Sequence, residues 1–145
     1  MYPQAAVVAI YQNGSFLFIV RARREGDPWS GNIAFPGGFI KPHESSREAA
    51  ARECYEEVGI FPEITASLGV FASNINNTSV EAFLAGGDIV KAKVNSQEVS
   101  SLLIAPVLQL TYRDDCYIYE GHRIWGLTFR ITNSAIGALE GSGTI

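Results

Sequence analysis

The chain has too few cysteines for a disulfide framework and no apolar run long enough to cross a membrane. Its 145 residues include two cysteines, Cys54 and Cys116, which can form one bridge at most. Cys54 falls inside a helical pattern, so we expect reduced thiols and a cytoplasmic location. No stretch reaches the roughly 18 apolar residues of a membrane helix. The N-terminus also lacks the basic region of a signal peptide.

Positive charge is scarce as well. Eleven Lys and Arg residues stand against 15 Asp and Glu, and the formal net charge is −4. This balance offers no electrostatic basis for binding nucleic acid, so no such partner is expected. The composition, 47% apolar and 18% charged, is typical of a globular domain. We expect a single domain over residues 1–139 and a flexible tail over residues 140–145.

Two β-rich runs near the N-terminus predict a hairpin. Residues 5–11 (AAVVAIY) and 16–20 (FLFIV) are rich in β-branched side chains and flank Asn13-Gly14. Asn-Gly favours a tight turn with positive φ. Both runs are apolar on both faces, which indicates a sheet that is covered on both sides.

The rest of the chain alternates between strand and helix signals. Further strands are predicted over residues 67–73, 79–85, 89–94 and 117–119. Residues 98–103 favour a short helix, and residues 106–110 favour an extended or loop segment. Apolar residues at helical spacing over 124–139 predict a C-terminal helix, with Trp125 packed in the core. Strands mixed with two longer helices indicate an α/β fold, with helices packed on a mixed sheet.

One of these helices is predicted between Ser45 and Gly59. Ser45-x-x-Glu48 has the form of a capping box, and three alanines at 49–51 favour the helix. Gly59 suits the left-handed position just past the helix end. Before the helix, the glycines of Pro36-Gly37-Gly38 allow the backbone to approach a ligand closely. Taken alone, these glycines fit an ordinary tight turn equally well.

Three glutamates gather at the C-terminal end of this helix. Glu53 lies three and four positions before Glu56 and Glu57, so the carboxylates share one face and repel by roughly 0.2–0.5 kcal/mol per pair. The helix dipole opposes the last two by about 0.3–1 kcal/mol each, and Arg52 relieves only part of this. A solvated acidic face is the ordinary interpretation. Beside a glycine-rich loop, a divalent cation explains the acids better, and oxygen ligands suit Mg²⁺ or Mn²⁺.

The spacing Gly38-x5-Glu44-x7-Arg52-Glu53-x2-Glu56-Glu57-x-Gly59 resembles the Nudix box. Cys54 stands where that family usually has a larger aliphatic residue. The resemblance implies an α/β/α sandwich, with the box helix and a C-terminal helix packed on a mixed sheet. It also implies an enzyme that uses Mg²⁺ or Mn²⁺ to hydrolyse a diphosphate between a nucleoside and another group. Members of the family are often homodimers, so a homodimer stays open for this chain.

The same resemblance assigns roles to residues of the box. The metal ligands would be Glu53, Glu56, Glu57 and the Gly37 carbonyl. Arg52 would orient the glutamates and Glu44 would brace the loop, while Gly38 and Gly59 would be structural.

A general base must take the proton of the attacking water. Glu53 is one candidate. Glu98 is another, because members of the family often carry a further acid at about this place in the chain. A helix-start position, favoured by the helix dipole, is the alternative interpretation of Glu98.

Two flanking segments resemble the coenzyme A diphosphatase branch of that family. They are residues 31–38 (GNIAFPGG), preceded by Arg21-Ala22, and residues 123–128 (RIWGLT). That branch splits coenzyme A into 4′-phosphopantetheine and adenosine 3′,5′-bisphosphate. Residues 23–30 depart from its fuller pattern. ADP-ribose, a dinucleotide or a nucleoside triphosphate are the alternative substrates, and a nucleotide sensor without catalysis is an alternative of another class.

Three arginines near this segment, Arg21, Arg23 and Arg24, suit phosphate oxygens because the guanidinium fork matches them. A basic strand end at the surface accounts for each of them equally well. Gly38 is expected to line the substrate site through its backbone. Trp29 fits base stacking and a buried loop anchor equally well.

Overall fold

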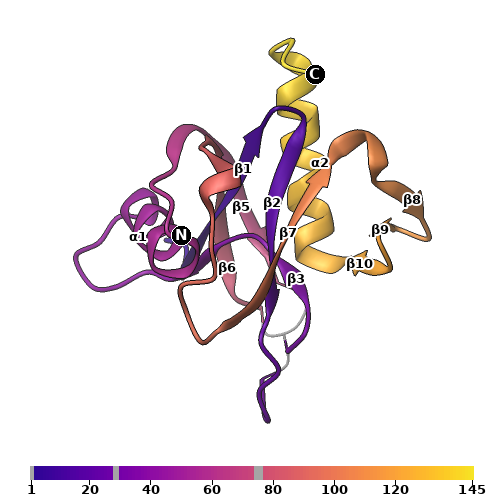
Figure 1. Cartoon of the computed structure of the whole chain (residues 1–145). Helices are drawn as coiled ribbons and strands as arrows, with labels where there is room; N and C mark the ends of the chain where they lie inside the picture. Colours follow the sequence, from indigo (N-terminus) through magenta and orange to yellow (C-terminus); the bar gives the residue numbers. More distant parts are fainter. Residues whose placement is uncertain (1, 28–29, 74–76) are drawn as a thin grey trace.

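The computed structural model describes residues 2–27, 30–73 and 77–145. In these residues two longer helices cover opposite faces of a mixed β-sheet, as Figure 1 shows with α1 at the left and α2 at the right. Helix α1 is Ser46–Val58 and helix α2 is Gly126–Gly141. The predicted α/β/α sandwich is therefore confirmed.

The N-terminal hairpin is confirmed with its turn. Strand β1 is Ala5–Gln12 and strand β2 is Ser15–Arg21, and they pair antiparallel, with Ile10 opposite Leu17. Asn13 and Gly14 have φ of 50° and 82°, the backbone that an Asn-Gly hairpin turn requires.

Five more strands complete the main sheet of the described residues. They are β3 Ile33–Ala34, β4 Gly37–Phe39, β5 Glu63–Ala72, β6 Ser79–Gly86 and β7 Val99–Pro106. The order is β3-β2-β1-β6-β5, with β4 on β1 and β7 on β2. Strands β1 and β6 run parallel, whereas the other pairs are antiparallel. The predicted strands at 67–73 and 79–85 are thus present, although β5 begins earlier.

Alternate residues of β1 enter two separate cores, because successive side chains of a strand point to opposite faces. Ala6, Val8 and Ile10 pack toward α1, while Ala9 packs toward α2. Helix α1 contributes Ala49, Ala50, Cys54 and Val58, and α2 contributes Ile131, Ala135 and Leu139. The central strands are therefore buried on both faces, as the sequence predicts.

Both ends of α1 carry the predicted caps. The Ser45 hydroxyl accepts the Glu48 N–H at 3.0 Å, and the Glu48 carboxylate accepts the Ser45 N–H at 3.0 Å. Gly59 has φ 75°, and its N–H donates to the Tyr55 carbonyl. This capping box and left-handed glycine fix where the box helix begins and ends.

The segment after β6 is not the predicted strand. Ile89–Lys91 forms a short 3₁₀ helix, η1, and the chain then donates the N–H groups of Lys93 and Asn95 to the carbonyls of Val58 and Glu57. Helix C-terminal carbonyls have no partner within the helix. Residues 93–95 satisfy two of them, so these residues are not available to the sheet.

The predicted helix at 98–103 is also wrong, because β7 occupies Val99–Pro106 and pairs with β2 from Val99 opposite Arg21 to Pro106 opposite Ser15. The sheet position beside the buried β2 decides the conformation over weak local preferences. After Pro106, the last residue of β7, Val107–Gln109 form the short 3₁₀ helix η2.

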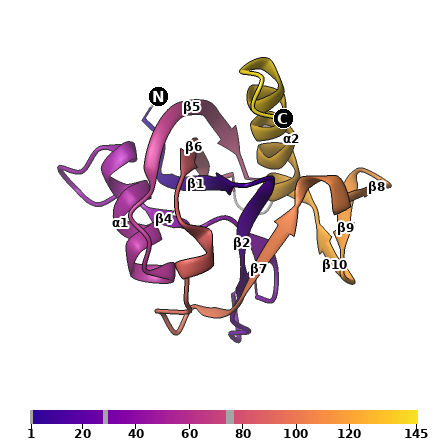
Figure 2. The ribbon, with the colours of Figure 1, turned by 45° about the horizontal axis from the view of Figure 1, so that its top comes forward.

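The C-terminal part holds a small second sheet beside α2, seen at the right of Figure 2. Its strands are β8 Thr111–Arg113, β9 Cys116–Tyr119 and β10 His122–Ile124. Ile124 therefore ends a strand, and the C-terminal helix begins two residues later than predicted. Trp125 is 37% exposed and does not belong to the core. The helix extends through Glu140 and Gly141, which were predicted for the tail.

Both cysteines are buried and unbridged. None of the helices in the described ranges is long and apolar enough to span a membrane.

Candidate active site

The glutamates of α1 lie against two glycines of β4. Gly37 and Gly38 pair with Val7 and Ala6 of β1, so they belong to a strand and not to a tight turn. The Gly37 N–H donates to Glu57 Oε1 at 2.8 Å. A Cβ on Gly38 would stand 2.5 Å from Glu53 Oε2. Gly38 therefore leaves the space in which the Glu53 carboxylate lies, while Gly37 lets β4 pack closely on Ala6 and Val7 of β1.

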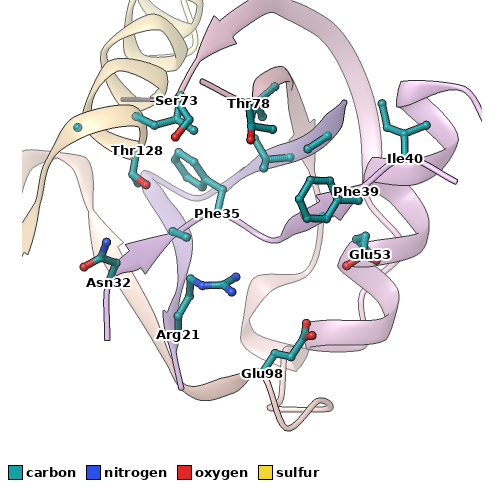
Figure 3. A pocket seen from close by; sticks show the side chains of 18 of the residues that line it. Arg21, Asn32, Phe35, Phe39, Ile40, Glu53, Ser73, Thr78, Glu98 and Thr128 are labelled. Atoms are coloured by element: carbon teal, nitrogen blue, oxygen red, sulfur yellow. The ribbon is translucent and has the colours of Figure 1, made fainter. Parts of the chain in front are cut away.

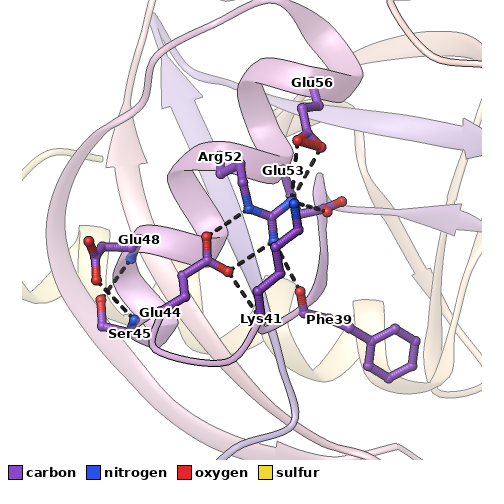
Figure 4. A network of polar contacts seen from close by, with 8 residues as sticks. All are labelled: Phe39, Lys41, Glu44, Ser45, Glu48, Arg52, Glu53 and Glu56. Atoms are coloured by element: carbon purple, nitrogen blue, oxygen red, sulfur yellow. Dashed lines mark hydrogen bonds and ion pairs between the residues drawn. The ribbon is translucent and has the colours of Figure 1, made fainter.

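Arg52 holds the acids of this helix together (Figure 4). Its Nε donates to Glu44 Oε2 at 2.7 Å and its Nη2 to Glu44 Oε1 at 3.0 Å. Its Nη1 donates to Glu53 Oε1 at 2.7 Å and to Glu56 Oε2 at 3.3 Å. Nη2 also donates to the Phe39 carbonyl at 3.2 Å. One guanidinium thereby fixes the loop before the helix, the end of β4 and two of the three glutamates.

Glu44 is the most strongly stabilised carboxylate of this network. Hydrogen bonds from Arg52 and then from the Lys41 N–H, which lies 3.0 Å from Oε1, lower the pKa of Glu44 to about 2. The same pairing raises the pKa of Arg52 above its ordinary value. Both groups are therefore charged at neutral pH, and Glu44 ties the loop to the helix.

Glu57 is the buried member of the cluster. Its side chain is 2% exposed, and Oε2 has no hydrogen-bond partner among the residues that the structure describes. Burial raises the pKa of Glu57 to about 8, against the lowering effect of the Gly37 N–H. The negative charges of Glu53 and Glu98 raise this pKa further, and the positive charge of Arg21 lowers it. An unpaired carboxylate in such a site is costly unless a cation joins it.

These acids fit a divalent cation by their chemistry, although they are not yet arranged around one. Carboxylate oxygens suit Mg²⁺ and Mn²⁺, and the unpartnered Oε2 of Glu57 is the observation that fits an ion. Within the described ranges, no three Asp, Glu, His or Cys side chains are grouped to hold a metal as they stand. Arg52 donates hydrogen bonds to both Glu53 and Glu56.

A cavity of about 560 Å³ opens beside this cluster. Its charged side is formed by Arg21, Arg52, Glu53 and Glu98, with Lys41 near the loop. Figure 3 shows Arg21, Glu53 and Glu98 on one side of it, with Ser73, Thr78 and Thr128 on the other. The uncharged side is lined by Ile33, Phe35, Ser73, Thr78, Val80, Leu127 and Thr128. The cavity thus joins a charged half to an uncharged half.

Arg21 and Glu98 come together at the adjoining ends of β2 and β7. Glu98 lies in the turn before β7, so its interpretation as a helix-start residue is wrong. Its carbonyl accepts the Ala22 N–H at 2.8 Å. Arg21 Nη2 pairs with Asp27 at 3.3 Å, while its buried Nε has no partner in the described part of the chain. A guanidinium therefore lies on the same charged side of the cavity as Glu53 and Glu98.

The other candidate residues lie elsewhere. Arg23 and Arg24 are not in the cavity wall; the Arg23 guanidinium instead lies against Gly31, 3.2 Å from the place of a Cβ. Glu56 is half-exposed at the rim of the cluster. Trp29 falls outside the described residues.

Sequence reasoning missed several residues of the wall, among them Asn32, Thr128 and Trp125. The sequence signal that could have identified these wall residues was their position in the segments 31–38 and 123–128, which flank the box. The Thr128 hydroxyl donates to the Ile33 carbonyl at 2.9 Å, which brings the start of α2 onto β3.

The sequence matches the model of the NUDIX domain over residues 1–110. Among curated proteins, an ADP-ribose pyrophosphatase from Methanocaldococcus jannaschii is 34% identical over 73 residues, which are 50% of this chain and 42% of that protein. A putative 8-oxo-dGTP diphosphatase from Bacillus subtilis is 35% identical over 71 residues, 49% of this chain and 44% of that protein. The chain thus spans less than half the length of these two relatives.

Solved structures share the fold. A MutT/nudix family protein from Enterococcus faecalis superposes with a TM-score of 0.71 at 17% identity, over 97% of this chain and 63% of that chain. At this identity the likeness concerns the fold alone.

Proposed function

The chain belongs to the Nudix family, and from this premise we propose that it hydrolyses the diphosphate linkage of a nucleoside diphosphate derivative with a divalent metal ion. One observation carries the proposal. Gly37 and Gly38 receive the carboxylates of Glu57 and Glu53 at the edge of a cavity, and Arg21 enters the same cavity. A metal-bound diphosphate needs this combination of acids, open backbone and a cation.

The proposed metal ligands are the carboxylates of Glu53, Glu56 and Glu57, with the Gly37 carbonyl as an additional oxygen. Bound Mg²⁺ or Mn²⁺ would offset phosphate charge and lower the pKa of a water. Arg52 positions Glu53 and Glu56, and part of its contact with them must be released for both to turn to an ion. Glu44, which takes two hydrogen bonds from Arg52, keeps the arginine in place during that exchange.

Arg21 is the proposed phosphate ligand from the chain itself. Arg21 lines the cavity, and its guanidinium can donate a charge-assisted hydrogen bond to a phosphate oxygen there. Arg23 and Arg24 are left out of this role because they do not line the cavity.

Glu98 is the proposed general base. It lines the cavity, so it lies within reach of a water that attacks the diphosphate. Glu53, the other candidate, accepts a short hydrogen bond from Arg52 and is needed as a ligand.

Two substrate types have support. The names of the two curated relatives favour an ADP-ribose or nucleoside triphosphate type of substrate. Coenzyme A is favoured by a different observation, since residues 31–38 and 123–128 carry the resemblance to its diphosphatases. Both segments line the one cavity and are joined by the hydrogen bond from Thr128 to Ile33.

A turnover screen tests the proposal. The purified protein is incubated with ADP-ribose, coenzyme A, a diadenosine polyphosphate and dGTP, with Mg²⁺, with Mn²⁺ and with chelator, and the products are identified by ³¹P NMR and mass spectrometry. We expect cleavage of a diphosphate only with metal, and a much lower kcat for Glu98→Gln. The exposed Glu63→Gln serves as the matched control. Tight binding without cleavage of any compound would support a nucleotide sensor instead.

A further inference from the structure

We propose that Trp125 recognises the nucleobase of the substrate by stacking on its flat face at the uncharged half of the cavity. The inference rests on the proposed function, because it assumes a substrate that contains a nucleoside. It assigns a specificity-determining residue outside the Nudix box.

Trp125 is held at the cavity by the backbone around it. It is the residue before α2, with φ −137° and ψ 176°, and Gly126 follows with φ 59°. A left-handed conformation suits glycine, and here it turns the chain from β10 into the helix. Trp125 is 37% exposed and lines both the main cavity and an adjoining one of about 380 Å³. It is therefore an open wall residue at the place where the two cavities meet.

Arg123 restrains the indole. Its Cζ lies 5.7 Å from the centre of the Trp125 ring, within the range of a cation–π interaction. A ring that is already oriented loses less conformational freedom when a ligand stacks on it. Contact with Arg123 thus favours a fixed orientation of the indole at the cavity wall.

The chemistry of the uncharged half fits a base and disfavours a phosphate. Among the described residues, the charged side chains that line the main cavity are Arg21, Lys41, Arg52, Glu53 and Glu98, and none of these five belongs to α2. A phosphate buried among Ile33, Phe35 and Leu127 would have no cationic side chain of the main cavity beside it, since the arginines at this end, Arg123 and Arg130, line the adjoining cavity. A neutral heteroaromatic ring with polar edges matches apolar walls that carry a few hydroxyls.

The distance between the two halves suits one nucleoside unit. Thr128 fastens the first turn of α2 to Ile33, and Gly37 follows four residues later. Four extended residues span at most about 13–14 Å. A substrate with its phosphates at Gly37 and Gly38 can therefore reach the start of α2 with its base.

Two alternatives to base stacking on Trp125 can be distinguished from it. The pantetheine arm of coenzyme A is also uncharged, but it has no flat ring to stack on. Phe39, 64% exposed, is the other open aromatic residue of the wall, but it lies at the charged side, where its carbonyl accepts a hydrogen bond from Arg52.

The test compares AMP with ribose 5-phosphate, which differ only by the base. Binding to metal-free protein is measured by calorimetry, and by the fluorescence of Trp125 in a Trp29→Phe background. We expect AMP to bind at least about tenfold more tightly, with quenching of the indole, because base–aromatic stacking commonly contributes that much. Trp125→Leu should remove the preference, and Trp125→Phe should keep most of it. In turnover, Trp125→Leu should raise KM for adenine-containing substrates while kcat changes little.

Phe61→Leu is the matched control, since Phe61 is an exposed aromatic residue, stacked on Tyr55, outside both cavities. An unchanged AMP preference in a folded Trp125→Leu protein would overturn the inference, as would an equal loss in Phe61→Leu or in Phe39→Leu. These binding readouts do not depend on turnover. The base preference can therefore fail while cleavage persists, or persist while cleavage fails.

Discussion

Replacing Glu57 by glutamine should stabilise the metal-free protein while abolishing its response to divalent metal. The folded protein buries this side chain to 2% exposure, and its pKa is about 8 in place of 4.5. The glutamine amide has nearly the same shape, and its oxygen can still accept the Gly37 N–H. The substitution therefore removes a group that can ionise and leaves the hydrogen bond to β4 in place.

The size and direction of the effect follow from the two pKa values. Between pH 4.5 and 8 the carboxyl of Glu57 stays protonated in the folded protein and ionises in the unfolded chain, so the native state loses stability as the pH rises. Each factor of ten in acidity corresponds to about 1.4 kcal/mol. The advantage of glutamine should thus be absent below pH 4.5, reach about 3 kcal/mol at pH 7 and level off near 5 kcal/mol above pH 8.

Urea unfolding in the presence of a chelator measures this difference. Wild type, Glu57→Gln and the exposed control Glu63→Gln are compared at pH 4, 7 and 8.5, and the titrations are repeated with Mg²⁺. We expect Mg²⁺ to stabilise wild type and Glu63→Gln but not Glu57→Gln. A Glu57→Gln protein that is less stable than wild type in chelator at pH 8.5, or that gains as much from Mg²⁺, would refute the reasoning.

Other substitutions test the two glycines of β4 and the ion pair between Glu44 and Arg52. Gly38→Ala places a Cβ 2.5 Å from Glu53 Oε2, so kcat should fall at least tenfold with little change in Tm, because a side-chain end can move. Gly37→Ala meets the backbone of Val7 and should lower Tm strongly; the opposite ranking of the two melting curves would contradict this. Glu44→Gln should lose about 1–3 kcal/mol at pH 7, a difference that shrinks as the pH falls from 4.5 toward 2. A pH-independent difference in unfolding free energy would exclude the ion pair as its cause.

The sequence predicts the elements that depend on strong local signals. The turn at Asn13-Gly14 and the caps at Ser45 and Gly59 are specified by residues a few positions apart, and each was found as expected. The unbroken apolar run of β1 likewise predicts a sheet covered on both faces, and the structure has one core on each face.

Elements whose conformation depends on residues far away in the sequence cannot be predicted from local signals. The segment 98–103 is a strand only because β2 offers it a partner. Residues 93–95 leave the sheet because the end of α1 has carbonyls to satisfy. Gly37 and Gly38 pair with β1, and the short sequence around them signals only a turn.

In the candidate site, too, local sequence signals predict some features, while others depend on contacts with distant parts of the chain. The box spacing predicts which acids share a face of α1, and the structure adds which of them is buried, Glu57, and which are held by Arg52. Trp125 was assigned to the core from its helical spacing. The positive φ of Gly126 starts the helix after Trp125 and leaves the ring at the cavity.

The most direct test of the metal site is a Mn²⁺ titration followed by electron paramagnetic resonance, with and without adenosine 5′-(α,β-methylene)diphosphate. We expect wild type and Glu63→Gln to remove free Mn²⁺ from solution with equal affinity, more strongly with the diphosphate analogue, and Glu57→Gln to lose this binding. Equal Mn²⁺ affinity in wild type and Glu57→Gln, or no binding by wild type with the analogue present, would contradict a metal-dependent diphosphate site at the end of α1.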